Sequence, residues 1–403
     1  MPYPIIGNVP RGEDYFGQEQ LIETLWKRLE KDNILLTAPR RFGKTAAMYK
    51  LLDEPRPQFL PLYTDLEPID TAGDFMVELI SKVYQKRQFK RIINKLWAGS
   101  KEIAVFFRNL PEDIDIGGFK FKVREATDMP VHWKTYGERL MDLISSEAPS
   151  LLLLLDEFAV MIDNIKRKNS EEAENVLRWF RAARIAPETG TRFVIGSSIN
   201  LIPTLDTMGL VDTVNDLYIQ KLQPFDDDTA RRYVDNVFDS QGVPLSTEAR
   251  DMVLTLVGAP IPYLLAVLLS IVIDQHHATG APVTPDLIKT VFDEDLLGGR
   301  TAASFRHYRS RIDTYYPGWE GDTTRAILRS LSRTTDGVEK QTVYQLFLKY
   351  STQTHSHKTE EGFFHLMHKL ENDFYISERN GRYDFFSRVL KMWWKTNYGF
   401  QGE

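Results

Sequence analysis

The most constraining feature of the sequence is an uninterrupted run of five leucines, Leu151–Leu155, that ends in Asp156 and Glu157. An apolar run without alternating polar residues predicts a strand that is buried on both faces of a parallel sheet. Parallel strands need crossover connections, which are usually helices, so the chain is expected to alternate strands with helices. The fold class that follows is α/β, with two carboxylates at the carboxyl end of one strand.

A second motif, APRRFGKT at residues 38–45, lies between a predicted strand, Ile34–Thr37, and a predicted helix that runs through Leu51. This is the context of a Walker A loop, whose backbone N–H groups surround phosphate oxygens at a helix N-terminus. Ala38 replaces the usual first glycine, so the strict motif is missed by one residue. The residues predicted to contact a nucleotide are Ala38, Pro39, Arg40, Arg41, Phe42, Gly43, Lys44, Thr45 and Ala46.

Four side chains receive specific roles. Lys44 is expected to reach the β- and γ-phosphates of ATP, while Thr45 and Asp156 hold Mg²⁺, Asp156 through its water shell. Glu157 is expected to orient or deprotonate the attacking water, because phosphoryl transfer depends on positioning and charge neutralisation. Either motif alone has an ordinary alternative, a chance Gly-Lys-Thr or an acidic strand end. Their joint appearance, about 110 residues apart, predicts a P-loop site for ATP and Mg²⁺.

A further buried strand, Arg192–Ser197, is followed by Ser198 and Asn200. Ligands lie beyond the carboxyl ends of parallel strands, so Ser197, Ser198 or Asn200 is placed to sense the γ-phosphate. Ordinary turn chemistry is the competing interpretation for each of them. Ser197 is the residue that we include in the predicted catalytic set.

Residues 1–225 are predicted to form the ATPase core. Strands at Phe59–Leu66 and Asp216–Leu222 complete its sheet. An insertion at about residues 82–133 interrupts it, beginning as a Lys/Arg-rich helix and continuing as a hairpin around Ile114–Val123, with two glycines near the hairpin's start.

Downstream of the core the pattern becomes helical. Residues 226–295 are predicted to form a lid of helices, broken at Gly258-Ala259-Pro260 among other places. Residues 296–322 are predicted to be a linker with a helix. Residues 323–403 combine helices with two short strands around Asn380-Gly381, a strong hairpin signal, which together predict a winged-helix domain.

The combination of APRRFGKT, LLLLLDEFA, RFVIGSSIN, LQPFDDDTARRYV and VGAPIPYLL resembles the archaeal-type ATPases with an origin-recognition-like AAA+ core. These ATPases belong to, or border on, the STAND class of signalling ATPases. The segment YFGQE at residues 15–19 looks like the family's F-x-G-R-E element, with Gln18 where Arg is usual. The segments GRYDF and MWW near the C-terminus look like the end of its winged helix. The resemblance covers nearly the whole chain and is weakest in the insertion.

The resemblance implies the usual P-loop roles for the Walker residues, a sensor at Ser197 or Ser198, and a place for Pro260 near the base or the lid hinge. It also implies a lid that rotates with nucleotide state, so that the protein acts as a switch and not as a bulk hydrolase.

Related AAA+ proteins complete their sites with an arginine from a neighbouring subunit, which implies a homo-oligomer. The arginines that lie between the acidic strand end and the sensor strand are Arg178, Arg181, Arg184 and Arg192. We include Arg184 in the predicted catalytic set; a solvated helix face is the alternative for each of the four. Arg40 and Arg41 are alternative phosphate contacts, or they face solvent or an acidic partner.

Nucleic acid is a second candidate partner, because a winged helix often reads DNA with one helix in the major groove. Residues 320–403 contain 12 Lys/Arg and 11 Asp/Glu, a nearly neutral balance. The clearest basic stretch comprises Lys82, Lys86, Arg87, Lys90, Arg91 and Lys95. These side chains fit either a nucleic-acid backbone or a solvated helix face. The histidines at 355, 357, 365 and 368 have no cysteine near them, and we do not interpret them as a metal site.

Composition limits the remaining classes. The chain has 403 residues, no cysteine and a formal net charge of −6, so disulfides are excluded and the chain as a whole is not a basic nucleic-acid binder. No apolar run approaches the roughly 20 residues that span a bilayer, and the N-terminus lacks a signal-peptide core, so we expect a cytoplasmic protein with no membrane partner.

Three functions fit these observations. The first is an ATP-hydrolysing switch that couples nucleotide state to assembly or to a protein partner. The second is an ATP-gated DNA-binding initiator or loader. The third is a scaffold in which the nucleotide is only structural.

Overall fold

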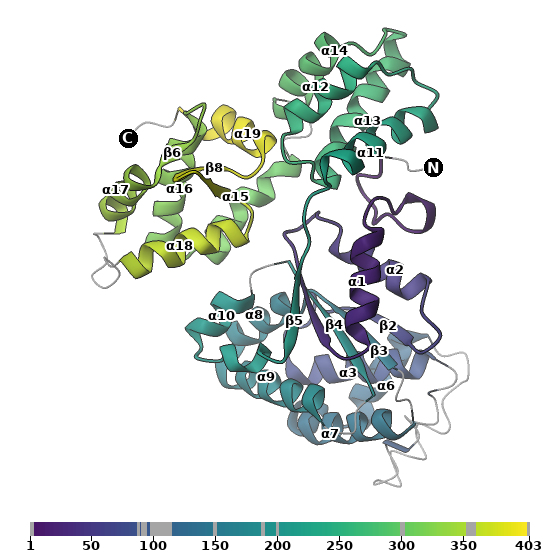
Figure 1. Ribbon diagram of the computed structural model, residues 1–403. Coiled ribbons are helices and arrows are strands. Elements are labelled where there is room, and N and C mark those ends of the chain that lie inside the picture. Colours follow the sequence, from purple (N-terminus) through teal and green to yellow (C-terminus); the bar gives the residue numbers. More distant parts are fainter. Residues whose placement is uncertain are drawn as a thin grey trace. The chain divides into compact units, whose positions relative to one another are not determined.

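The computed structural model describes residues 4–86, 89, 95–96, 115–147, 151–186, 190–198, 201–298, 303–351 and 360–400. The chain divides into two compact units. Gln18–Leu222 forms the first unit, and Met1–Gly17 together with Gln223–Glu403 forms the second. Figure 1 shows the elements of both units in sequence colours.

The first unit is built on a five-stranded parallel sheet with the strand order β2-β3-β4-β1-β5. Its strands are β1 Asn33–Thr37, β2 Leu60–Asp65, β3 Leu151–Asp156, β4 Arg192–Ser197 and β5 Leu217–Lys221. All six residues of β3 are buried, as its continuous apolar sequence predicts. The predicted α/β class with a parallel sheet is therefore confirmed.

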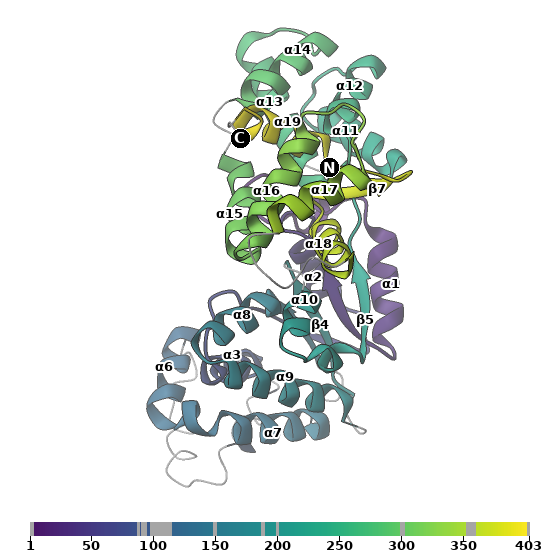
Figure 2. The same ribbon diagram turned by 90° about the vertical axis from the view of Figure 1, so that its left-hand side faces the viewer.

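Helices cover both faces of this sheet. They are α1 Glu19–Leu29, α2 Lys44–Asp53, α3 Ala72–Gln85, α6 Ile116–Ala126, α7 Met129–Glu147, α8 Phe158–Lys168, α9 Ser170–Ile185 and α10 Leu201–Thr207. In Figure 2, α1 lies on one side of the sheet and α8 and α9 lie on the other. A cluster of buried aromatic rings, centred on Phe75 and Phe180, packs α3, α8 and α9 together against β4.

The predicted hairpin around Ile114–Val123 is wrong: residues 116–126 form helix α6. Asp115 caps this helix, because its side chain accepts a hydrogen bond of 2.8 Å from the Gly118 amide. Phe119 and Val123 are both buried and four residues apart, which is the spacing of one helix face. The two glycines that suggested a turn lie in the first turn of the helix. Of the predicted basic stretch, Arg87, Lys90 and Arg91 lie outside the described residues.

The second unit begins with a helical part. Its helices are α11 Asp227–Ser240, α12 Thr247–Val257, α13 Pro262–Thr279 and α14 Pro285–Thr290, followed by a π-helix at Val291–Leu297. The N-terminal segment, with a 3₁₀ turn at Gly12–Asp14, also belongs here. Its Phe16 ring lies 6.3 Å from Phe225 and 5.5 Å from Tyr233, so the first residues of the chain pack on α11.

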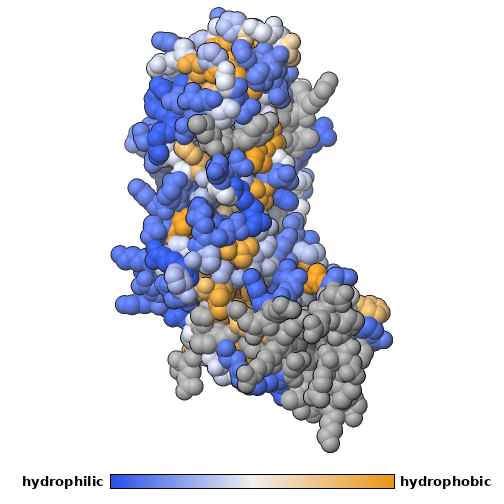
Figure 3. All heavy atoms as spheres, turned by 90° about the vertical axis from the view of Figure 1, so that its right-hand side faces the viewer, coloured by the Kyte–Doolittle hydropathy of each residue, from blue (hydrophilic) through white to orange (hydrophobic). Residues whose placement is uncertain are grey.

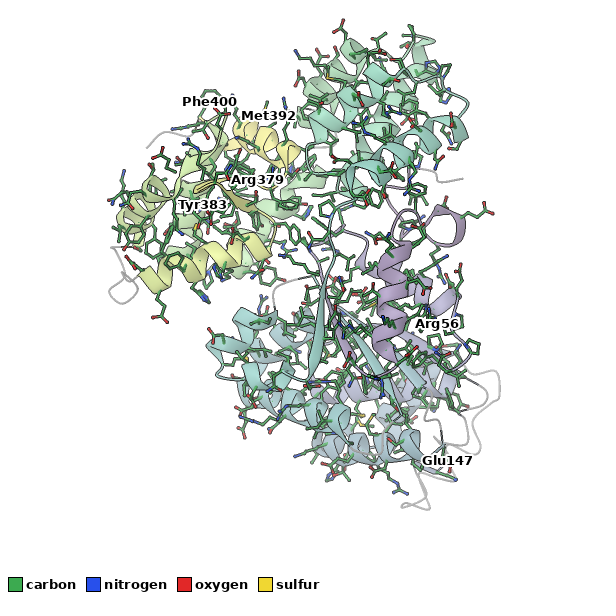
Figure 4. The ribbon with its side chains drawn as sticks, viewed as in Figure 1. Arg56, Glu147, Arg379, Tyr383, Met392 and Phe400 are labelled. Carbon is green, nitrogen blue, oxygen red and sulfur yellow. The ribbon has the colours of Figure 1, made fainter. Side chains whose placement is uncertain are left out.

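The rest of the unit combines helices with a small antiparallel sheet of order β6-β8-β7. Its elements are α15 Ala303–Tyr315, α16 Trp319–Ser332, β6 Val338–Glu339, α17 Lys340–Ser351, α18 Glu360–Asn372, β7 Ile376–Arg379, β8 Arg382–Phe385 and α19 Arg388–Tyr398. Asn380 and Gly381 connect β7 and β8 with positive φ angles of 52° and 75°, as the Asn-Gly signal predicts. Tyr383 of β8 is buried, whereas Arg379 near the turn is exposed (Figure 4). This arrangement fits the predicted winged helix.

The segment predicted as a linker contains helix α15, which is packed and not extended. The hydroxyl of Tyr375 donates to the carbonyl of Tyr308 at 2.7 Å, and the hydroxyl of Tyr316 donates to Asp373 at 2.7 Å. These bonds attach α15 and the residue after it to the turn between α18 and β7.

The helices and one face of the surface can be compared with those of a membrane protein. Across the described ranges, no helix is both long enough and apolar enough to cross a membrane. On the face in Figure 3, the apolar side chains of the described residues form separate small patches between hydrophilic ones.

Candidate functional site

The loop between β1 and α2 has the backbone of an anion-binding loop. Arg41 and Gly43 have φ angles of 75° and 94°, in the left-handed region that favours glycine. Backbone of this kind forms concavities lined by N–H groups. The amide of Ala38 donates to the carbonyl of Ser197, which ties the start of the loop to the end of β4. The loop therefore opens beside the carboxyl ends of the central strands.

Lys44 and the acidic end of β3 form a buried ion-pair cluster. The Lys44 ammonium donates to Asp156 Oδ1 and, at 3.1 Å, to Glu157 Oε1. The side chains of Lys44 and Asp156 are 4% and 2% exposed, so water does not solvate these charges. Thr45 Oγ1 donates to Asp156 Oδ2 at 2.6 Å. The structure thus brings together the four side chains for which we predicted the principal roles.

Both members of the buried pair are held in their charged forms. Burial alone lowers the pKa of Lys44, but Asp156 and Glu157 outweigh it and leave that pKa above its ordinary value. Burial likewise raises the pKa of Asp156, whereas Lys44 and the hydrogen bonds from Thr45 and the Glu157 amide bring it below its ordinary value. The site therefore contains an ammonium group that is ion-paired with two carboxylates.

Glu157 has an unusual backbone for its residue type. It has φ 55° and ψ 32° and stands at the N-terminus of α8. A non-glycine residue in this region is uncommon and is often found at functional sites. Its Oε2 accepts a hydrogen bond from Ser198 Oγ, while its Oε1 faces Lys44. The carboxylate is thereby oriented from both sides.

The residues predicted as candidate sensors of the γ-phosphate differ in their positions. Ser198 reaches the carboxylate of Glu157, whereas Ser197 is a buried residue at the end of β4, in register with Thr37 of β1. Ser197 contributes its backbone carbonyl to the phosphate loop. Asn200 lies outside the described residues.

Two residues at the end of β2 also belong to the site, although sequence reasoning missed them. Asp65 lies opposite Asp156 in the register of β2 and β3, and the Tyr63 hydroxyl donates to Asp156 Oδ2 at 3.3 Å. Burial raises the pKa of Asp65, and the charges of Asp156 and Glu157 add to that rise. The available signal was a strand that ends in a carboxylate, with Tyr63 two residues earlier on the same face.

The remaining loop residues differ in exposure. Phe42 and Ala46 are buried, so only their backbone is available to a ligand. Arg40 is exposed, and its guanidinium lies 3.9 Å from Glu67 Oε1. Glu67 follows β2, so Arg40 connects the phosphate loop with the segment after Asp65.

The structure places Arg184 away from the other residues of the predicted catalytic set. Its buried guanidinium donates to Asp216 at 2.9 and 3.0 Å and to the carbonyl of Thr213 at 2.6 Å. Its carbonyl accepts from Asn33, the first residue of β1. Arg184 therefore lies at the amino edge of the sheet, at the opposite end of the strands from Lys44. Asp216 precedes β5 and lies beside the end of α9, so it is within reach of the Arg184 guanidinium.

The other three candidate arginines each have a different partner. Arg178 is exposed and pairs with Glu174 on its own helix, Arg181 donates to Asn215, and Arg192 donates to the carbonyl of Leu29. Arg178 is the exposed member of the four. A role for it at a neighbouring copy stays a prediction.

Pro260 belongs to the second unit, between α12 and α13. Its carbonyl accepts from the amide of Phe225 at 3.1 Å, and the nearby Gly258 has φ 72°. A Cβ at Gly258 would lie 2.8 Å from the Cβ of Arg388, so only glycine fits where this turn meets the start of α19. The predicted place of Pro260 near a nucleotide base stays a prediction.

The donor set fits Mg²⁺ bound together with phosphate. Hydroxyl and carboxylate oxygens are the ligands Mg²⁺ prefers, and it usually takes one or two protein ligands plus water and phosphate oxygens. Thr45 and Asp156 supply such a pair. Among the described residues, no three His, Cys, Asp or Glu side chains are grouped to hold a metal by themselves. A metal at this site would therefore arrive with its phosphate.

Comparison with known proteins gives a fold and no closer identity. No family model and no curated protein matches the sequence. Among solved structures, the chain is similar to the Walker-type ATPase PABY2304 of Pyrococcus abyssi, with a TM-score of 0.60, 17% identity and 98% of each chain covered. It is also similar to the ORC2 protein of Aeropyrum pernix in its ADPNP–ADP complexes, with a TM-score of 0.53, 12% identity, and 96% of this chain and 97% of that chain covered. The chain therefore has the fold of these P-loop ATPases, and Lys44, Thr45, Asp156 and Glu157 lie together at the carboxyl edge of its sheet.

Proposed function

We propose that this protein binds Mg·ATP at the carboxyl end of β3, hydrolyses it slowly, and acts as a switch for assembly or for a partner protein. The observation that supports this most is the cluster of Lys44, Thr45, Asp156 and Glu157. Lys44 and Asp156 are 112 positions apart in sequence but are in contact in the fold. If Lys44 only began a helix and Asp156 only ended a strand, nothing would require their opposite charges to be in contact.

Lys44 is the residue that exchanges partners in this scheme. Its ammonium is ion-paired with both Asp156 and Glu157. A phosphate in the loop would draw Lys44 toward its oxygens, and the two carboxylates would lose this counter-charge. Mg²⁺ held by Thr45 and Asp156 would supply positive charge to the carboxylates and to the phosphates. Binding of nucleotide and of metal is therefore coupled through Asp156.

Glu157 is the residue that acts on water. Once Lys44 leaves, the Ser198 hydroxyl still holds one oxygen of Glu157, which leaves Oε1 free to accept a proton or a hydrogen bond from water. Among the described residues, Arg184 points away from the site and so supplies no charge to a transition state there in cis. We therefore propose that hydrolysis is slow until another copy or a partner contributes a charge.

The DNA-binding alternative is less well supported by the described residues. The exposed side chains of α18, which corresponds to the reading helix of a winged helix, include Glu360, Glu361 and Phe364, but no exposed Lys or Arg in this described helix. Lys369 is held by Glu320 at 2.6 Å. A helix that enters the major groove needs positive charge near the phosphates. We propose a protein partner in preference to DNA.

The described lysines of the basic stretch in the insertion also favour a protein partner over DNA. Lys82 lies 3.9 Å from Glu78, and Lys95 pairs with Glu147. Each lysine lies beside an acidic side chain, so neither charge depends on a nucleic-acid phosphate for a partner.

The experiment compares ATP binding and ATP hydrolysis in Glu157→Gln. The amide keeps the size of the side chain but cannot act as a base, so hydrolysis is expected to fall by about 100-fold or more while Mg·ATP affinity is retained. Glu23→Gln, on the exposed face of α1, is the control and is expected to hydrolyse ATP like the wild type. Hydrolysis that persists in Glu157→Gln would exclude this mechanism, and a wild type that binds ATP without hydrolysing it would favour the scaffold.

A further inference from the structure

Asp156 is fully occupied by hydrogen-bond donors. Oδ1 accepts from Lys44 and from the amide of Glu157 at 2.9 Å, and Oδ2 accepts from Thr45 at 2.6 Å and from Tyr63 at 3.3 Å. Two of these donors, Lys44 and Thr45, are the side chains with roles toward phosphate and Mg²⁺. Tyr63 is the donor whose side chain has no other assigned role.

Lys44 would turn toward phosphate in a filled site. The Thr45 oxygen could bind the metal through a lone pair while its O–H still donates to Oδ2. Asp156 would then be held by the Glu157 amide at Oδ1 and by Thr45 and Tyr63 at Oδ2. Of the two donors on Oδ2, Tyr63 is the one with no role toward the metal itself. The χ2 angle of an aspartate is broad, so a carboxylate with fewer donors rotates more freely. The hydrogen bond from Tyr63 restricts that rotation.

The Tyr63 ring is held in place by the same elements that build the site. It lies on β2, which pairs in parallel with β3, and the register places Tyr63 beside Leu154 and Asp65 beside Asp156. The ring packs on Tyr49 of α2 with centroids 4.7 Å apart and planes at 55°. Helix α2 is also the helix that begins with Lys44 and Thr45. Tyr63 therefore lies between the helix that supplies the phosphate ligands and the strand that supplies the carboxylate.

The Tyr63 phenol is the donor in its hydrogen bond with Asp156 Oδ2. A neutral hydroxyl beside a carboxylate can only donate to it, so the direction of the hydrogen bond is fixed.

We propose that Tyr63 is a positioning residue that holds Asp156 in the orientation that binds the metal of the Mg·nucleotide complex. This inference rests on the proposed function, because it concerns the same site. Groups that hydrogen-bond to metal ligands typically change metal affinity or activity by about 10- to 100-fold when they are removed. The expected effect is thus on the metal and not on the nucleotide alone.

The test measures metal and nucleotide binding separately in Tyr63→Phe. Mn²⁺ is titrated into protein saturated with ADP and followed by electron paramagnetic resonance, and ADP affinity is measured in EDTA. We expect Mn²⁺ affinity to fall by about 10-fold or more, with ADP affinity in EDTA unchanged. The Mg²⁺ concentration for half-maximal hydrolysis should rise by a similar factor.

Tyr218→Phe is the matched control, because Tyr218 lies in the same sheet, on β5, away from Asp156. It should bind Mn²⁺ and ADP like the wild type. Equal Mn²⁺ affinity in Tyr63→Phe and Tyr218→Phe would overturn the proposal, and so would a Tyr63→Phe protein that loses ADP in EDTA to the same extent as Mn²⁺. If the wild type itself fails to bind ADP with Mn²⁺, the proposed function fails as well, and the two failures are thereby distinguished.

Discussion

Single residues decide how closely the strands approach at the site. Gly196 of β4 lies directly beside Asp156, and a Cβ at this position would lie 2.5 Å from Asp156 Oδ1 and 2.7 Å from Met48 Cε. The backbone of Asp156 is also close, with its Cα at 3.3 Å. The absence of a side chain at Gly196 therefore leaves the room in which Asp156 takes its orientation.

We predict that Gly196→Ala destabilises the fold and weakens nucleotide binding together. The methyl group has to displace Asp156 or Met48, and overpacking of this kind costs about 1–3 kcal/mol. Urea unfolding and titration with a fluorescent ADP analogue measure the two effects. Gly7→Ala is the control, because a Cβ at Gly7 meets no atom within 4 Å. A Gly196→Ala protein that unfolds and binds like Gly7→Ala would contradict this description of the site.

The sequence predicted the residues whose signal is local. Lys44 and Thr45 follow a strand in one short motif, and Asp156 and Glu157 end an apolar run, so each pair is visible without tertiary information. Tyr63 is different, because its role depends on the register of β2 against β3, which no pattern within β2 reveals. Ser198 and Ser197 are adjacent, and only the direction of the chain after β4 decides which of them reaches Glu157.

At the scale of elements, the direction of the Arg184 side chain is decided by contacts between elements, which its position in the sequence does not reveal. Arg184 is the next-to-last residue of α9, where a residue that projects toward a neighbour was predicted. Asp216 and Thr213 lie beside it in the fold and enclose its guanidinium, which also packs over the ring of Phe180 at 4.6 Å. The pair joins α9 to the start of β5 and stabilises the amino edge of the sheet.

We predict that Arg184→Ala is a stability variant and not a catalytic one. Loss of one partner leaves Asp216 without its counter-charge, and breaking a buried pair costs about 3–5 kcal/mol. Denaturant unfolding measures this loss, and kcat per folded molecule is expected to be unchanged. Arg178→Ala, whose partner Glu174 is on the surface, should change stability by less than about 1 kcal/mol. A normal free energy of unfolding with a large loss of kcat in Arg184→Ala would restore the original prediction.

The two glycine-containing segments show why one hairpin was predicted correctly and another was not. Asn380-Gly381 requires two positive φ angles, and both are present. Gly117 and Gly118 are in a helix instead, because Asp115 caps it and Phe119 packs on Tyr84 with centroids 3.9 Å apart. A glycine pair is compatible with both conformations, and the buried neighbour decides between them.

At the scale of the molecule, the two compact units can be set beside the predicted core of residues 1–225. The predicted end of the core, residue 225, is close to the observed boundary between Leu222 and Gln223. The N-terminal segment belongs instead to the second unit, since Phe16 packs on Phe225 and Tyr233. Contacts between the first residues and residues more than 200 positions later leave no trace in local sequence patterns.

We predict that activity depends on contact between copies. If Arg178 completes the site of a neighbour, specific ATPase activity rises with protein concentration. A mixture of Glu157→Gln, which keeps Arg178, and Arg178→Ala, which keeps its own Walker residues, should regain activity that neither variant has alone. Flat activity on dilution, together with no gain on mixing, would indicate a site completed within one chain.

The central claim is that Lys44 leaves the carboxylates of β3 to bind the phosphates of Mg·ATP. The most direct test is calorimetric titration of a non-hydrolysable ATP analogue with Mg²⁺ into the wild type, Lys44→Ala and Lys50→Ala. Lys50 lies on the same helix and pairs with Glu54 at the surface, so it controls for the loss of a positive charge. We predict that Lys44→Ala binds at least about tenfold more weakly than the other two proteins, because hydrogen bonds to charged groups contribute about 1.5–3 kcal/mol. Equal affinity in all three proteins would contradict this account.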